Sequence, residues 1–136
     1  MIRISDHLGM LAIVLLFGFF LKHFVADFCL QTPYMYKNKG NLWHPGGYFH
    51  AFIHAYLSLF ILFGNHIQAE TSFGLVFVEF WIHFLTDWTK VNINKKTGWT
   101  ATNSEGFWVL LGLDQFIHSL TYLGMVWYVL RGVADG

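Results

Sequence analysis

Imidazole and carboxyl side chains recur at four-residue intervals within four otherwise apolar segments of the chain. Residues four apart lie on one face of an α-helix, so each group is expected to form a polar stripe on its helix. Imidazole and carboxylate are also the ligands that Zn, Mn and Fe accept in proteins. The longest group is Glu79, His83 and Asp87, and the other three are the pairs His23 and Asp27, His50 and His54, and Asp114 and His118.

These groups predict a metal site whose ligands come from four helices. Four-helix bundles build dinuclear sites from inward-facing side chains with such spacing. We expect two divalent ions, with coordination positions left for water; zinc is favoured, and manganese or iron would suit the same ligands. The eight expected ligands are His23, Asp27, His50, His54, His83, Asp87, Asp114 and His118.

Further polar residues on the same segments suit supporting roles. Glu79 lies about 16 Å from the predicted end of its helix, beyond the main layer, and is expected to carry protons or to orient a ligand. Asp114 is a second candidate proton carrier. Gln115, beside it, is expected to hydrogen-bond a ligand or substrate, and Gln31 a substrate head group. We expect Lys22 to extend toward the membrane surface or to pair with an acid.

The composition indicates lipid as the solvent. Hydrophobic residues make up 55% of the 136 residues, aromatic residues 20% and charged residues only 12%. The charged fraction is about half that of a typical soluble protein. Eight basic residues balance eight acidic ones, and the absence of a basic run excludes a nucleic-acid partner.

Four apolar segments predict an all-α, integral membrane four-helix bundle in a single domain spanning residues 1–136. A helix needs about 20 apolar residues to span a bilayer. Thr71 and Ser72 are candidate N-caps for the third helix, and Thr102 with Glu105 matches a capping box before the fourth. The predicted helices cover residues 8–30, 47–64, 72–90 and 105–130.

The distribution of lysines predicts the orientation. Lys37 and Lys39 lie in the first loop, and Lys90, Lys95 and Lys96 lie in or beside the third, whereas residues 64–72 contain no Lys or Arg. The positive-inside rule therefore places both termini on the non-cytoplasmic side of a bacterial inner membrane.

The four groups are expected at a similar distance from the cytoplasmic ends of their helices. With a rise of about 1.5 Å per residue, every His/Asp pair falls within about 18 Å of the predicted cytoplasmic helix end. Ionisable groups in hydrocarbon cost several kcal/mol unless paired, so these side chains must face one another. A structural hydrogen-bond network is the alternative role for any single member.

The four motifs together resemble a domain-of-unknown-function family of small bacterial and phage membrane proteins. The resemblance covers nearly the whole chain, and each motif is weak on its own. The pattern is also loosely similar to inner-membrane proteins classed as metal-dependent hydrolases. Both similarities imply a membrane metalloprotein, and neither implies a particular substrate. The quoted motifs are His23-x3-Asp27-x3-Gln31, His50-x3-His54, His83-x3-Asp87 followed by Lys90, and Asp114-Gln115-x2-His118.

We expect a metal-dependent hydrolase acting on a lipid or lipid-linked substrate at the cytoplasmic leaflet. A divalent ion makes water nucleophilic near neutral pH, so no Ser or Cys nucleophile is needed. A di-iron oxidase or desaturase is an alternative, although Glu-x-x-His spacing is absent. A divalent-metal or proton transporter and a non-catalytic membrane interaction protein also stay open, as does homo-oligomerisation.

Overall fold

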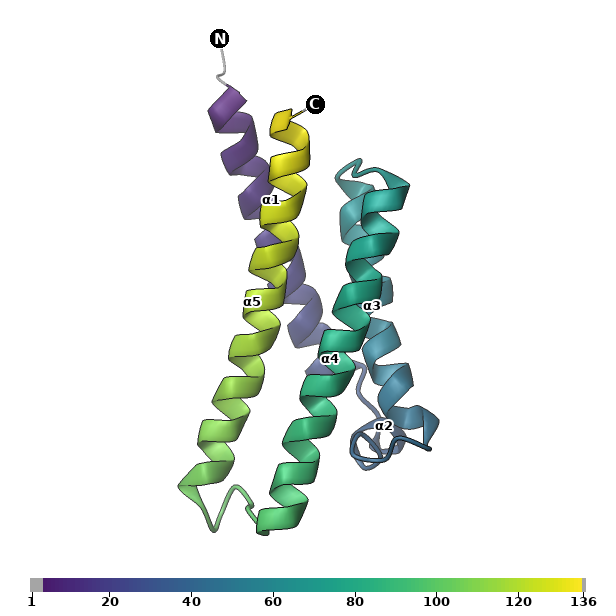
Figure 1. The fold of residues 1–136 in the computed structure, drawn as a ribbon, viewed down its shortest axis with the longest axis vertical. Coiled ribbons are helices and arrows are strands. Elements are labelled where there is room, and N and C mark those ends of the chain that lie inside the picture. Colours follow the sequence, from purple (N-terminus) through teal and green to yellow (C-terminus); the bar gives the residue numbers. More distant parts are fainter. Residues whose placement is uncertain (1–3, 136) are drawn as a thin grey trace.

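The computed structural model describes residues 4–135, which contain helices and no strand (Figure 1). The expected all-helical fold is therefore confirmed. The elements in chain order are α1 (Ile4–Phe24), the π-helical turn η1 (Val25–Cys29), the short α2 (Pro33–Tyr36), α3 (Pro45–Gly64), α4 (Ala69–Thr97) and α5 (Glu105–Asp135).

Several helix ends differ from the expected ones. α1 begins at Ile4, before the expected start at residue 8, and α5 continues to Asp135, past the expected end at residue 130. α4 begins at Ala69 and continues to Thr97, past the expected end at residue 90. The polarity of residues 91–97 predicts a loop. However, this segment contains no Pro or Gly, and polar residues can form the solvent-exposed end of a helix, which here ends before Gly98. The expected N-caps are wrong: Thr71 and Ser72 lie inside α4, and the Oγ of Ser104, rather than Thr102, accepts the Gly106 N–H at 3.1 Å.

The four long helices enclose a common interior. α1 packs against α3 and α5, and α4 packs against the same two helices from the other side. The two described chain ends lie at the end of the bundle that also holds the α3–α4 turn, whereas α2 and the α4–α5 connection lie at the opposite end (Figure 1). We call these the terminal end and the loop end.

The interior is divided into an apolar and a polar part. Toward the terminal end, Leu15, Phe19, Leu62 and Val126 form the apolar core, and the Phe19 ring stacks on Tyr122 with centroids 5.5 Å apart. The buried histidines and carboxylates occupy the interior on the loop-end side of this core. The bundle is therefore sealed by apolar packing on one side of its polar centre.

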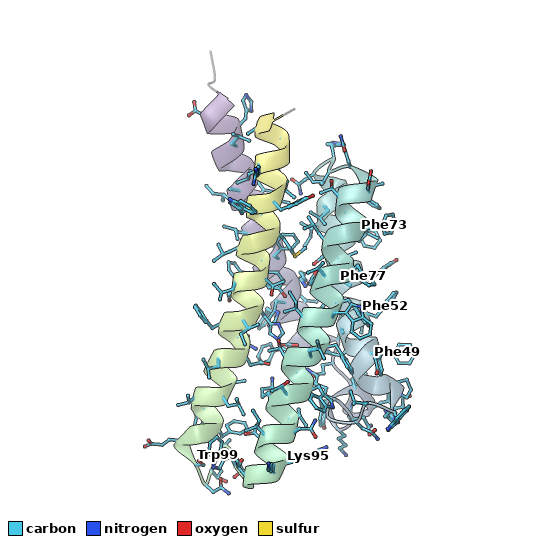
Figure 2. All side chains as sticks on the ribbon, in the orientation of Figure 1. Phe49, Phe52, Phe73, Phe77, Lys95 and Trp99 are labelled. Carbon is cyan, nitrogen blue, oxygen red and sulfur yellow. The ribbon has the colours of Figure 1, made fainter. Side chains whose placement is uncertain are left out.

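The outer surface is rich in large apolar side chains. Phe52, Phe73 and Phe77 are all more than half exposed and project outward from α3 and α4 (Figure 2). Within the described residues, three helical stretches are long and apolar enough to cross a membrane: Asp6–Cys29, Pro45–Gly64 and Glu105–Ala134. α4 is not among them. A polar interior beneath an apolar surface is compatible with a membrane protein.

A buried ion pair joins α1 to α4. The Lys22 ammonium contacts the Glu79 carboxylate, and both side chains are almost fully buried. Lys22 also donates to the His54 carbonyl oxygen on α3 at 3.3 Å. The expected pairing of Lys22 with an acid is confirmed, and the pair connects three helices where the polar and apolar parts of the interior meet.

The buried Lys22–Glu79 pair predicts that removing one partner destabilises the fold more than removing both. Lys22→Met leaves the Glu79 carboxylate buried without its cation and should destabilise the fold by about 3–5 kcal/mol, whereas the Lys22→Met/Glu79→Leu double variant should regain most of that loss. Thermal unfolding of the purified chain in detergent measures both, with the exposed Lys37→Met as the control. A double variant less stable than the single one would contradict the predicted role of the pair.

Candidate metal centre

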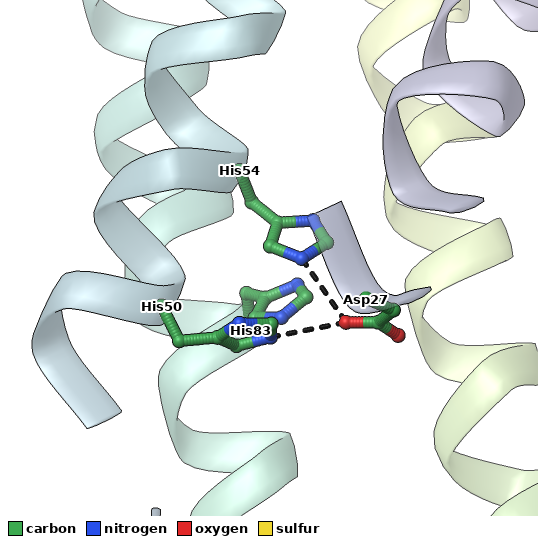
Figure 3. Close-up of side chains that lie close together, drawn as sticks. All are labelled: Asp27, His50, His54 and His83. Carbon is green, nitrogen blue, oxygen red and sulfur yellow. Dashed lines mark hydrogen bonds and ion pairs between the residues drawn. The ribbon is translucent and has the colours of Figure 1, made fainter. Parts of the chain in front are cut away.

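Four side chains from three parts of the fold converge on one point in the interior (Figure 3). Asp27 comes from η1, His50 and His54 from α3, and His83 from α4; one ligand atom of each lies within 4.8 Å of the others. The Asp27 Oδ1 lies 3.1 Å from the His50 Nε2 and 3.2 Å from the His54 Nε2. Ligand atoms of a tetrahedral zinc ion are about 3.4 Å apart, so this spacing suits a metal.

A second group shares His83 with the first. His83, Asp87 and His118 also offer ligand atoms within 4.8 Å of one another. The Asp87 Oδ2 lies 3.5 Å from the His83 Nε2, and the His118 Nε2 lies 3.5 Å from the Asp114 Oδ1. The two groups therefore adjoin through His83, and together with Asp114 they bring seven of the eight expected ligands into one cluster.

The donor atoms of this cluster are buried and largely without hydrogen bonds. Both ring nitrogens of His50 and of His83 lack a partner with hydrogen-bond geometry, as do the Nε2 of His118 and one oxygen each of Asp87 and Asp114. Buried polar groups in folded proteins nearly always find such a partner. Several of these atoms still lie close to an ionisable neighbour, such as Asp87 Oδ2 to Lys39 and His50 Nε2 to Asp27. A convergent set of imidazole and carboxylate atoms of this kind is also a suitable set of metal ligands.

A π-helical turn carries Asp27 into the cluster. The Leu30 N–H donates to the Val25 carbonyl oxygen at 3.0 Å, which is the five-residue pattern of a π-helix. Such turns occur often at functional sites, where the extra residue changes the direction of a side chain. The contact expected from the four-residue spacing is retained, because His23 Nε2 lies 3.2 Å from Asp27 Oδ2. Nothing in the residue types of 25–29 indicates the turn.

Two lysines neutralise carboxylates of the cluster. Lys39, from the α2–α3 connection, places its ammonium 2.7 Å from the Asp87 Oδ2. Lys90 of α4 lies 2.7 Å from the Asp114 Oδ2 and 3.3 Å from the Asp87 Oδ1. From the sequence, Lys39 is expected only in the first loop, and no periodic spacing identifies it as a residue of the site.

His23 lies beside the cluster with both ring nitrogens engaged by protein groups. Its Nδ1 lies 2.7 Å from the Tyr122 hydroxyl, and its Nε2 lies 3.2 Å from the Gln115 Oε1. Gln115 in turn donates to the Asp114 Oδ2 at 3.0 Å. His23 is absent from both groups of convergent ligand atoms. These contacts favour a role for His23 in orienting its neighbours Asp27 and Gln115 over the expected role as a metal ligand.

Tyr122 belongs to this site although its chemistry was not predicted. Its side chain is buried, and its hydroxyl contacts His23. Tyr122 follows His118 by four residues, so it continues the stripe that Asp114 and His118 begin on α5. The same spacing that indicated the other residues could have identified it.

The two remaining candidates lie at the margins of the cluster. Glu79 pairs with Lys22, whose ammonium lies 3.4 Å from the His54 Nδ1, so Glu79 acts on the ligand set through Lys22. Of the two expected roles of Glu79, the ion pair with Lys22 favours orienting a ligand, His54, over carrying protons. Gln31 donates to the backbone oxygen of Asp27 at 2.9 Å, and its contact with a substrate stays a prediction.

A pocket joins the cluster to the outer surface between α1 and α5. Its volume is about 260 Å³, and His23, Gln115 and His118 line its inner wall. Phe24 and Phe28 line it as well, and both rings are more than half exposed at the bundle surface. The pocket therefore connects the apolar exterior with the polar centre.

Comparison with known proteins gives one match. A family model described as a protein of unknown function (DUF3307) matches residues 15–135, which include every residue of the cluster. No curated protein and no solved structure matches the chain.

The shared position of His83 predicts how metal content responds to substitution. The purified chain should hold about two divalent ions. His54→Ala and His118→Ala should each lose about one of them, and His83→Ala should lose both, because His83 belongs to both groups. Elemental analysis of protein purified in detergent measures the metal-to-protein ratio.

The exposed His66→Ala on the α3–α4 turn is the matched control and should retain the full metal content. A wild-type chain that stays metal-free after incubation with zinc, manganese or ferrous ions, and that is stable in that form, would refute the metal site.

Proposed function

The chain belongs to the DUF3307 family of proteins of unknown function, and from its own site we propose that it is a membrane-embedded metal-dependent hydrolase acting on a lipid or lipid-linked substrate. The observation that carries this proposal is the pocket through which the buried His/Asp cluster meets the apolar exterior. A lipid can present its reacting bond to His118 and Gln115 while its chains stay in contact with Phe24 and Phe28.

The cluster contains the parts that hydrolysis requires. Divalent ions held by Asp27, His50, His54, His83, Asp87 and His118 would make water nucleophilic and polarise the attacked bond. The buried Asp114, whose Oδ1 lies 3.5 Å from the His118 Nε2, is the carboxylate that would take a proton from that water. Gln115 holds the other oxygen of Asp114 and also contacts His23, so it fixes both side chains at the pocket wall.

The distribution of polar residues favours hydrolysis over transport. A transporter needs a continuous polar path across the whole bundle. In the described interior beyond the Lys22–Glu79 pair, Leu15, Phe19 and Leu62 pack together, and the buried polar side chains on that side are the hydroxyls of Ser58 and Ser72. An oxidase of the di-iron type would be expected to draw on Glu-x-x-His ligand pairs, and the cluster is built from Asp and His.

The membrane arrangement belongs to the same proposal. We treat α4 as a fourth spanning helix, because it completes the ring with α3 and α5 and buries Glu79 and Asp87. It also presents Phe73, Phe77 and Leu85 outward. Lys37, Lys95 and Lys96 lie at the loop end, so the positive-inside rule places that end in the cytoplasm of a bacterial cell and both termini outside. The ligand cluster then faces the cytoplasmic leaflet.

Cysteine labelling tests this orientation. In a Cys29→Ser background, Gln68→Cys at the α3–α4 turn should react with a membrane-impermeant maleimide in intact cells whose outer membrane has been permeabilised. Thr102→Cys, at the loop end, should react only after the inner membrane is opened. The reverse pattern would overturn the proposed orientation, and labelling of both variants in intact cells would overturn the spanning arrangement.

Filling the pocket tests the hydrolase. Ser119 lines the pocket, and its hydroxyl donates to the main-chain carbonyl oxygen of Gln115 at 2.9 Å. Ser119→Phe should leave the metal content unchanged while lowering turnover at least about tenfold, because the added ring occupies the space of the substrate. Release of product from a panel of acyl and phosphoryl lipids in mixed micelles measures it.

Ser119→Ala, which removes the hydroxyl without filling the pocket, should keep most of the activity. His83→Ala should abolish activity with the fold intact. Turnover by His83→Ala at the wild-type rate would refute a metal-dependent reaction, and normal turnover by Ser119→Phe would refute this route of entry.

A further inference from the structure

We infer that the group cleaved at this centre is a phosphoryl group, and that Lys39 and Lys90 bind it. This inference rests on the proposed hydrolase and narrows its substrate to phosphate esters or diphosphates of lipids. The observations that carry it are the charge balance of the cluster and the way in which the chain places the two lysines.

The net charge expected for the metal-loaded centre favours an anionic substrate. Asp27, Asp87 and Asp114 supply three negative charges, and Lys39 and Lys90 supply two positive ones, while Lys22 and Glu79 neutralise each other. Two divalent ions would leave three positive charges in a buried site. Unbalanced buried charge is costly, and a carboxylic ester brings none to offset it. A phosphate monoester or diphosphate brings two or three negative charges.

Metal binding would also release Lys39 from its present partner, Asp87. The Asp87 Oδ2 that contacts Lys39 lies 3.3 Å from the His50 Nε2 and 3.5 Å from the His83 Nε2. An ion held by these atoms would share this oxygen with the ammonium and repel it. Ammonium groups next to a metal-bound carboxylate are suited to bind phosphate oxygens, a frequent role of lysine.

Close packing fixes Lys39 in the interior. A Cβ at Gly47 of α3 would lie 3.1 Å from the Phe84 ring and 3.4 Å from the Lys39 Cα, and a Cβ at Gly40 would lie 2.7 Å from the Val91 side chain. Asn92 donates to the Gly40 carbonyl oxygen at 3.0 Å. The α2–α3 connection is therefore held against α3 and α4, and Lys39 is only 7% exposed. A lysine serving the positive-inside rule alone would not need this burial.

Lys90 connects the cluster to the pocket. Its ammonium contacts Asp114, which accepts from Gln115 and lies beside His118, and Gln115 and His118 both line the pocket. A head group entering between α1 and α5 would thus meet Gln115 and His118 first, and Lys90 lies behind them across Asp114. Lys90 is the more accessible of the two lysines.

The reaction balances without a further reactant. The oxygen of one water molecule forms a bond to the terminal phosphorus, and the bond between that phosphorus and its leaving oxygen breaks. The leaving oxygen is the lipid oxygen in a monoester and the bridging oxygen in a diphosphate. One proton of the water is taken up by the site and returned to the leaving oxygen, and the other stays on the phosphate. A monoester gives a lipid alcohol and inorganic phosphate, and a diphosphate gives a lipid monophosphate and inorganic phosphate.

Binding of inorganic phosphate to the metal-loaded chain in detergent tests the inference without relying on turnover. Calorimetric titration should show phosphate binding to wild type, and Lys39→Gln and Lys90→Gln should each weaken it at least about tenfold, as expected for the loss of a charged hydrogen bond. Lys39→Arg, which keeps the charge, should retain most of the affinity. Lys37→Gln and Lys96→Gln, at exposed positions of the same end, are matched controls.

The metal content of every sample is measured first. It distinguishes failure of the proposed hydrolase function from failure of the phosphoryl inference alone. A chain that binds no metal overturns the proposed function and this inference with it. A metal-loaded chain that cleaves acyl esters but neither binds phosphate nor cleaves phosphoryl lipids overturns the inference alone. Wild-type phosphate affinity in metal-loaded Lys39→Gln and Lys90→Gln also overturns it.

Discussion

Every buried charge in this bundle must meet its counterpart inside the protein, because the apolar surroundings offer none. That constraint accounts for the placement of the helices. α1 contributes Lys22 where α4 contributes Glu79, and the α2–α3 connection brings Lys39 to Asp87. Apolar contacts alone would tolerate many rotations of one helix against another, whereas these pairings select one.

The spacing of residues predicted much of the site. Four-residue intervals place side chains on one helix face whatever the detailed packing, and the cost of exposing charge to lipid then turns those faces inward. For this reason Asp27, His50, His54, His83, Asp87 and His118 could be expected together from the sequence. That they bind metal stays a prediction.

Other features depend on tertiary contacts that no local pattern records. Lys39 reaches the centre through the close packing of Gly40 and Gly47, and its neighbours in sequence resemble an ordinary loop. The π-helical turn at residues 25–29 and the extension of α4 to Thr97 were also missed, since residue type alone distinguishes neither from its alternative. His23 and Glu79 were assigned from spacing, but the partners on other helices decide what they do.

The α3–α4 hairpin has a consequence for the order in which the ligand cluster is assembled. His50 and His54 on one arm and His83 and Asp87 on the other are joined by a turn of only residues 65–68. Two neighbouring helices inserted as one unit thus already carry two-thirds of the convergent ligand atoms. η1, which follows α1, and α5 then complete the cluster by adding Asp27 and His118. If the helices fold in chain order, the cluster is complete only once α5 is in place, since His118 lies on α5.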